Sequence, residues 1–216
     1  MCFSSTASFS AGVVISGLGV ASLRQVRHTR QLPFAGIPVF FGIQQIAEGF
    51  LWLSLTNPAY AAAQGAATTV FLLFAQAVWP LWVPLSMWLL ENRPSRKRWL
   101  LALLGVGSLL SGYLLYCVLT SEVQVSINRH NLHYTLNFPQ GLSWLSFFLY
   151  LLCTIVPSFL SSVWLMRVFA WFSVVSFCVA LFFFKENLVS IWCFFAAALS
   201  ILVLVILRLL RKNGGA

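Results

Sequence analysis

The sequence predicts an all-α integral membrane protein, one polytopic domain built as a bundle of seven transmembrane helices. Of its 216 residues, 60% are hydrophobic and only 8% are charged, whereas about a quarter of the residues in an ordinary soluble domain are charged. Apolar blocks long enough to cross a bilayer alternate with short polar connections. Lys and Arg gather in every second connection, as they do in multi-span membrane proteins.

Seven apolar blocks define the expected helices. A bilayer core about 30 Å thick requires about 20 apolar residues in each crossing helix. With charged residues, prolines and polar clusters as boundaries, the expected spans are residues 8–23, 32–55, 63–90, 99–120, 142–163, 168–184 and 188–210. No basic residue precedes the first block, so we expect a retained helix there rather than a secretory signal.

The basic residues give the expected orientation. Eleven of the thirteen lie in alternate connections or at the carboxyl end: Arg24, Arg27, Arg30, Arg93, Arg96, Lys97, Arg98, Arg167, Arg208, Arg211 and Lys212. Only Arg129 and Lys185 lie in the other set of connections. Under the positive-inside rule, this asymmetry places the amino terminus outside and the carboxyl terminus inside.

The connection between the fourth and fifth spans has a pattern of its own. Over residues 122–138, apolar residues alternate with polar ones on both sides of a polar turn from Asn128 to Asn131. Period-two alternation around a four-residue turn predicts a β-hairpin. We expect this hairpin to cover the outer mouth of the bundle, with Tyr134 and Phe138 facing the helices.

Composition also excludes several classes of function. The four acidic residues are all glutamates, which excludes aspartic-protease dyads and EF-hand loops. The net charge of +9 comes from the basic connections between spans, so we expect no nucleic-acid partner. Five scattered cysteines form neither a disulfide framework nor a CxxC metal motif, and the common nucleotide-binding and hydrolase motifs are absent.

Glu48 is the only acidic residue inside an expected span. A carboxylate at this depth has to be protonated, paired or in contact with a wet cavity, because unpaired burial is costly. Gln44 and Gln45 precede it by four and three residues, so the three side chains share one helix face. They predict an outward-facing polar pocket that binds a proton, a metal or a polar ligand. The alternative is polar packing between helices.

Two further polar residues are candidate ligand-binding groups. Gln76 lies four residues before Pro80, whose ring prevents helical hydrogen bonding of the carbonyl at position 76. The second candidate is Tyr150, which belongs to a polar stripe in the fifth expected span. The stripe has three- and four-residue intervals and is formed by Ser143, Ser146, Tyr150, Cys153 and Thr154. Each feature predicts either a cavity wall or hydrogen bonds between neighbouring helices.

Three residues near the expected outer surface are candidate metal ligands together with Glu48. Removal of Met1 would give Cys2 a free amine beside its thiol, a group that can bind a metal or act as a nucleophile, although a plain terminal residue is the simpler interpretation. His130 and His133 have the HxxH spacing that suits a metal on a helix, but a hairpin would separate their side chains. The sequence does not identify a cofactor; if these residues bind a metal, zinc or another divalent transition metal is expected.

Three amino-terminal segments resemble a family of small bacterial multi-span membrane proteins of unknown function. They are residues 1–9 (MCFSSTASF), 30–35 (RQLPFA) and 44–49 (QQIAEG). The resemblance implies a multi-pass protein of the bacterial cytoplasmic (inner) membrane. It implies no catalytic residue.

Three hypotheses about function fit these observations. The first is a metal-assisted hydrolase or transferase that acts on a lipid or small amphiphile, with Glu48 and Cys2 as catalytic groups, although it lacks the three-histidine zinc set of seven-span hydrolases. The second is a proton-coupled transporter or binding protein for a small solute, in which Glu48 exchanges a proton. The third is a structural or sensory subunit. The expected partners are the lipid bilayer and a lipid or small-molecule ligand, and the sequence does not indicate an oligomeric state.

Overall fold

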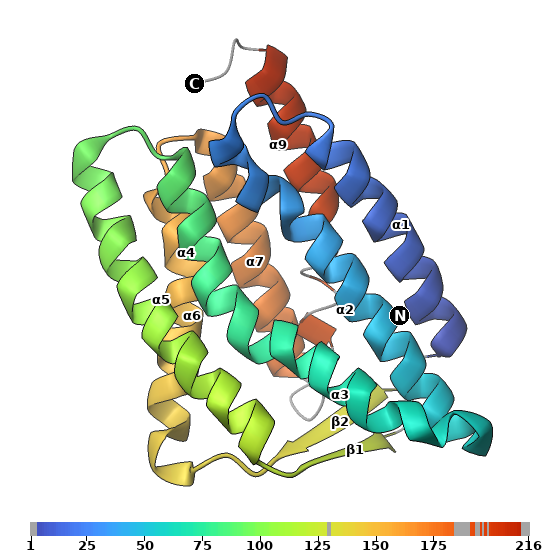
Figure 1. The fold of residues 1–216 in the computed structure, drawn as a ribbon. Coiled ribbons are helices and arrows are strands. Elements are labelled where there is room, and N and C mark those ends of the chain that lie inside the picture. Colours follow the sequence, from blue (N-terminus) through green and yellow to red (C-terminus); the bar gives the residue numbers. More distant parts are fainter. Residues whose placement is uncertain are drawn as a thin grey trace.

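The computed structural model describes residues 4–128, 131–183, 191–192, 195, 197 and 199–212. This part of the chain is an elongated bundle of helices with a two-stranded sheet at one end (Figure 1). Its longer elements are α1 (Ser5–Leu23), α2 (Leu32–Thr56), α3 (Gln64–Leu72), α4 (Trp79–Leu90), α5 (Pro94–Thr120), β1 (Val123–Asn128), β2 (Asn131–Leu136), α6 (Ser143–Leu160), α7 (Trp164–Phe183) and α9 (Ser200–Lys212). Short 3₁₀ helices at Thr29–Gln31, Pro58–Ala63 and Gln140–Leu142 precede α2, α3 and α6.

Six helical segments of the described chain are long and apolar enough to cross a membrane. They are Ser5–Leu23, Thr29–Thr56, Pro58–Leu90, Pro94–Thr120, Ser143–Leu160 and Trp164–Phe183. These segments correspond to the first six predicted spans, with edges that differ by a few residues. The seventh predicted span, residues 188–210, lies partly outside the described residues, and its described part contains most of α9.

Helices α1 and α2 pack closely because small residues face the contact. A Cβ atom on Gly12 would lie 2.7 Å from Cγ1 of Ile46, and one on Gly19 would lie 2.6 Å from Cγ2 of Val39. Ser8, one turn before Gly12, is completely buried. Small residues of this kind allow close approach of two apolar helices, so α1 covers one face of α2.

The third of these apolar segments, Pro58–Leu90, changes helix type near its centre. Leu73–Val78 forms a π-helix that joins α3 to α4 and ends just before Pro80. Because Pro80 has no N–H, it can make neither an α-type bond to the carbonyl of Gln76 nor a π-type bond to that of Ala75. Helix α5 lies tightly against this break, since a Cβ atom on Gly107 would overlap the carbonyl oxygen of Pro80.

Strands β1 and β2 form the predicted antiparallel hairpin, with Asn128 opposite Asn131. Its apolar face packs on a hydrophobic core to which α2, α3, the π-helix and α5 contribute. Leu132 is completely buried in that core. The ring of Tyr134 stacks on that of Phe71, with centroids 4.9 Å apart and 3° between the ring planes. The hairpin predicted from period-two alternation is confirmed, including the direction of Tyr134.

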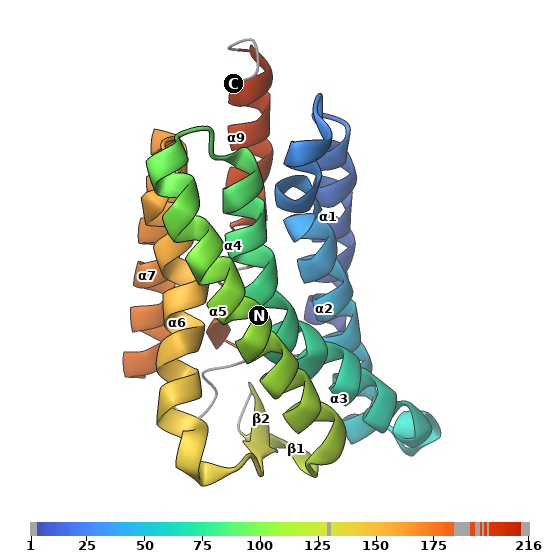
Figure 2. The ribbon, with the colours of Figure 1, turned by 60° about the vertical axis from the view of Figure 1, so that its left-hand side comes forward.

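Basic residues and the hairpin lie at opposite ends of the bundle. The connections α1–α2, α4–α5 and α6–α7 and the carboxyl end of α9 are at the end away from the hairpin (Figures 1 and 2). Together with the first turns of α5 and α7, these segments hold eleven of the thirteen Lys and Arg residues of the chain. The other two, Arg129 and Lys185, lie outside the described residues.

At the basic end of the bundle, Glu91 joins the α4–α5 connection to the α6–α7 connection, and its side chain is completely buried. The backbone N–H groups of Arg93 and Ser162 donate to its two carboxylate oxygens over 2.8 and 2.6 Å. Burial opposes ionisation of Glu91, but these hydrogen bonds outweigh it and hold its pKa below the ordinary value of 4.5. Arg96 closes the same junction by donating to the carbonyl oxygen of Ser161 over 2.8 Å.

Candidate ligand-binding site

Gln44, Gln45 and Glu48 lie together on α2 and are buried, with exposed fractions of 0, 1 and 0%. Gln45 Nε2 donates to Glu48 Oε2 over 3.1 Å, as a spacing of three residues on a helix allows. Trp79 of α4 donates its indole N–H to Gln44 Oε1 over 3.3 Å. The three residues therefore form a polar group that also joins α2 to α4.

This polar group is only partly satisfied. Gln44 Nε2, Gln45 Oε1 and the indole N–H of Trp52 are buried without a hydrogen-bond partner in the described part of the chain. Each such atom costs about 1–3 kcal/mol, so the group is costly in an apolar bundle. Glu48 lines neither of the two pockets described below, and it does not contact solvent in the structure.

A pocket of about 390 Å³, which we name the hairpin-end pocket, lies between the π-helix, α5, α6 and the segment after β2. The two residues predicted to bind a ligand in addition to the α2 group, Gln76 and Tyr150, both line it. Its other polar side chains are Tyr113, Asn137, Ser143 and Ser146. The rest of its wall is Ala75, Leu114, Leu136, Phe138, Pro139, Phe147 and Trp192.

Gln76 provides unused hydrogen-bonding capacity in this pocket. Its side-chain amide has no hydrogen-bond partner among the described residues, so its N–H and C=O groups can bind a ligand. Asn137 and Ser143 are exposed, which places them at the rim and connects the pocket with the protein surface. The pocket thus combines an apolar wall with a few polar groups that can orient a ligand.

Tyr150 separates the hairpin-end pocket from a second, smaller cavity. Its hydroxyl donates to the carbonyl oxygen of Ala75 over 2.7 Å, and this is the carbonyl that Pro80 leaves without a π-type partner. Trp192 packs edge-on against the ring of Tyr150, with ring centroids 5.7 Å apart. Tyr150 and Trp192 line both spaces, so they form the wall between them.

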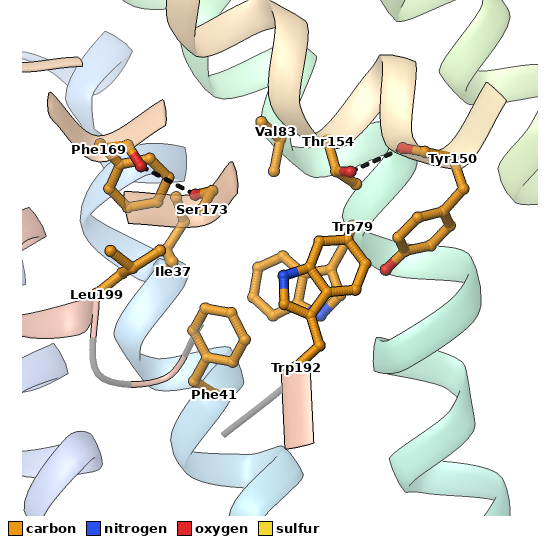
Figure 3. Close-up of a pocket in the computed structure, with 10 residues that line it drawn as sticks. All are labelled: Ile37, Phe41, Trp79, Val83, Tyr150, Thr154, Phe169, Ser173, Trp192 and Leu199. Carbon is orange, nitrogen blue, oxygen red and sulfur yellow. Dashed lines mark hydrogen bonds between the residues drawn. The ribbon is translucent and has the colours of Figure 1, made fainter. Parts of the chain in front are cut away.

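The second space, which we name the inner cavity, measures about 60 Å³. Figure 3 shows the side chains around it: Ile37, Phe41, Trp79, Val83, Tyr150, Thr154, Phe169, Ser173, Trp192 and Leu199. The hydroxyls of Thr154 and Ser173 donate to carbonyl groups of their own helices over 2.7 and 3.0 Å. The cavity is therefore apolar. Through Trp79, its wall also contacts Gln44 of the α2 polar group.

The candidate metal ligands are not brought together in the described part of the chain. No three His, Cys, Asp or Glu side chains lie close enough there to hold a metal ion. His133 lies on β2 opposite Ser126, and Glu48 lies within α2. Cys2 and His130 fall outside the described residues. The hairpin-end pocket instead offers amide and hydroxyl groups to a ligand.

Trp192 and Asn137 line the pocket but were not identified from the sequence. A single tryptophan in an apolar span is common, and only the fold brings Trp192 beside Tyr150. Asn137 follows β2 and precedes Pro139, where the chain turns towards α6. A polar residue at that turn is the one local signal that could have indicated it.

Comparison with known proteins identifies a family. A family model described as a family of unknown function (DUF6629) matches residues 1–215. No curated protein and no solved structure matches the chain. The resemblance to a family of unknown function is confirmed, whereas the bacterial membrane location that it implied stays a prediction.

Proposed function

We propose that this chain, which belongs to the DUF6629 family of unknown function, is an integral membrane protein that binds a small amphiphilic molecule in the hairpin-end pocket. The observation that carries the proposal is the amide of Gln76, which has no hydrogen-bond partner among the described residues, in a pocket whose wall is otherwise mostly apolar. A volume of about 390 Å³ lies within the range of small-molecule sites, about 300–1,000 Å³. The polar head of an amphiphile can bind the amide of Gln76, and its apolar part can contact the apolar wall.

The proposed setting is a bacterial cytoplasmic membrane crossed seven times, with the hairpin outside. Six long apolar segments among the described residues and a further apolar helix, α9, support this arrangement. The location of eleven basic residues at the end away from the hairpin supports the orientation. A ligand would then enter the pocket from the outer leaflet or the outer surface.

The test is the identity of what the protein retains from its own membrane. Wild-type protein is extracted with surrounding lipid, and its small amphiphiles are quantified by mass spectrometry against the bulk membrane. We expect one molecule to be enriched, and its enrichment to fall by about tenfold in Gln76→Leu, the loss expected for one or two hydrogen bonds. The matched control is Gln124→Leu on the exposed face of β1, which should retain the molecule. Equal enrichment in Gln76→Leu would contradict the proposal.

A second function, proton-coupled transport of the bound molecule, is supported by the position of Glu48. This carboxyl is buried on α2, and its neighbour Gln44 contacts Trp79 in the wall of the inner cavity. A change in the charge of Glu48 can therefore alter the wall of the inner cavity, which lies next to the hairpin-end pocket. Glu48→Gln keeps an acceptor for Gln45 while removing the acid, so it should preserve folding and ligand binding but abolish pH-driven uptake into proteoliposomes. Unchanged uptake by Glu48→Gln would argue for polar packing instead.

Metal-assisted hydrolysis receives less support from the described residues, because no group of three ligands is assembled there. Its remaining candidates, Cys2 and His130, lie outside the described residues. Zinc analysis of purified wild type distinguishes the hypotheses. Stoichiometric zinc that is lost in both Glu48→Gln and His133→Ala would restore the enzyme hypothesis.

A further inference from the structure

We propose that the inner cavity holds the tail end of the ligand and that the ligand is an uncharged single-chain amphiphile. The inference rests on the proposed function, because it assumes that the polar head of the ligand occupies the hairpin-end pocket. It adds the direction in which the ligand lies, the charge of its head and the number of its chains.

The two spaces share a wall of two aromatic side chains, one of which, Tyr150, has to break its hydrogen bond to Ala75 in order to move. Tyr150 and Trp192 line both of them and contact each other edge to face. Aromatic side chains in such a wall change direction by rotation about their side-chain bonds, without a change in the helices. A chain that enters beside Gln76 can therefore continue into the inner cavity when these two rings move apart.

The lining of the inner cavity fits hydrocarbon and offers little to a polar group. The two hydroxyls in its wall, those of Thr154 and Ser173, are already bonded to backbone carbonyls. Apolar cavities of this kind stay dry and bind apolar groups. Its volume of about 60 Å³ is much smaller than the 390 Å³ of the hairpin-end pocket, which suits the end of one chain.

The hairpin-end pocket indicates an uncharged head. Among its described lining residues, the polar groups are amides and hydroxyls, and none of the side chains carries a charge. The hydroxyl of Ser146 already donates to the carbonyl oxygen of Leu142, so the groups that can bind a head include the amides of Gln76 and Asn137. An ionised head would lose hydration there without gaining a counter-charge from the described lining, which is unfavourable. Hydroxyl, ester or amide heads gain hydrogen bonds in the same place. The buried indole N–H of Trp192, which has no partner in the described chain, can donate to an ester or amide oxygen near the wall.

The experiment uses a 1-monoacylglycerol that carries a diazirine at the end of its chain. Wild-type protein in lipid nanodiscs is irradiated with this probe, and the labelled residues are mapped by mass spectrometry. We expect label on inner-cavity residues such as Phe41, Val83 and Phe169. Unlabelled monoacylglycerol should displace the probe, and the fatty acid of equal chain length should compete about tenfold more weakly, since the described lining offers its carboxylate no counter-charge.

Two variants fill the inner cavity from different helices, Ser173→Leu on α7 and Thr154→Leu on α6. In each, we expect the label to move to hairpin-end residues such as Phe147 or Leu114, with the total yield changed less than about twofold because the head site is intact. Agreement between the two variants guards against a folding defect in one of them. Gln76→Leu should lower the total yield about tenfold without redirecting the label.

The outcomes separate the two proposals. Label confined to the hairpin-end pocket in wild type would overturn the inner-cavity assignment and leave the proposed function standing. Equal competition by the fatty acid would overturn the uncharged head. Absence of displaceable label from the whole pocket would contradict the proposed function itself.

Discussion

The hydroxyl of Tyr150 donates to the carbonyl oxygen of Ala75, 2.7 Å away, across the contact between α6 and the π-helix. Pro80 lies five residues after Ala75 and has no N–H to offer this carbonyl in a π-helix. The same tyrosine ring lines both the hairpin-end pocket and the inner cavity. A backbone irregularity in the third apolar segment thus fixes a side chain that lies between these two spaces.

Tyr150→Phe removes this hydrogen bond and leaves the Ala75 carbonyl without it. We expect the free energy of unfolding to fall by about 1–3 kcal/mol, measured by chemical denaturation in lipid or mild detergent. Tyr60→Phe is the matched control, because Tyr60 is 45% exposed in a short 3₁₀ helix, and it should change stability by less than about 0.5 kcal/mol. Equal effects of the two variants would show that the Tyr150 contact is not structural.

Gly107 and Gly105, two residues apart on α5, should respond to alanine in opposite ways. Gly107→Ala places a methyl group against the Pro80 carbonyl and should lower stability by about 1–3 kcal/mol through overpacking. At Gly105 nothing lies within 4 Å of the added atom, so Gly105→Ala should raise stability by about 0.5–1 kcal/mol through helix propensity. Thermal unfolding of both variants checks this, and a neutral Gly107→Ala would mean that α5 lies further from Pro80.

Glu91 should make stability depend on pH at the acid end of the range. Its pKa in the folded protein lies below the ordinary value of 4.5, so its carboxylate stabilises the fold fully above that value. The contribution is lost as the pH falls through the folded-state pKa. Glu91→Gln weakens the hydrogen bonds from Arg93 and Ser162 and should cost about 1.5–3 kcal/mol at neutral pH. The difference from wild type should shrink on acidification, and a difference independent of pH would contradict this role.

The membrane orientation can be tested with reporter fusions. Fusions after Pro58 and Asn131 should report the outside, and fusions after Thr29, Ser95 and Gly214 should report the inside, because the basic segments stay in the cytoplasm. A reproducible reversal at Asn131 or Ser95 would overturn the proposed topology.

The helices and the hairpin could be predicted from the sequence because their signals are local. Block length and charge predicted the positions of the six long apolar helical segments to within a few residues. Alternation around Asn128 and Asn131 identified the strands and their register. The π-helix was only partly foreseen, since Pro80 indicated a break in the third span but not the wider turn before it.

The site could be predicted only where a local pattern marked a residue. The proximity of Pro80 indicated Gln76 as a ligand-binding residue, and the polar stripe of the fifth expected span indicated Tyr150. The position of Glu48 depends on how α2 is rotated against α4 and the hairpin, and such a rotation is set by packing between distant segments. The position of Trp192 could not be predicted for the same reason, because its segment follows Tyr150 by more than forty residues in the chain.

A density map of the protein extracted with its native lipid tests ligand binding in the hairpin-end pocket. We predict elongated density beside the amide of Gln76 that passes between Tyr150 and Trp192 and ends in the inner cavity. The same map from Gln76→Leu should lose this density while the helices stay in place. A wild-type pocket filled by water alone, or closed by the protein's own side chains, would contradict the proposal that this protein binds an amphiphile there.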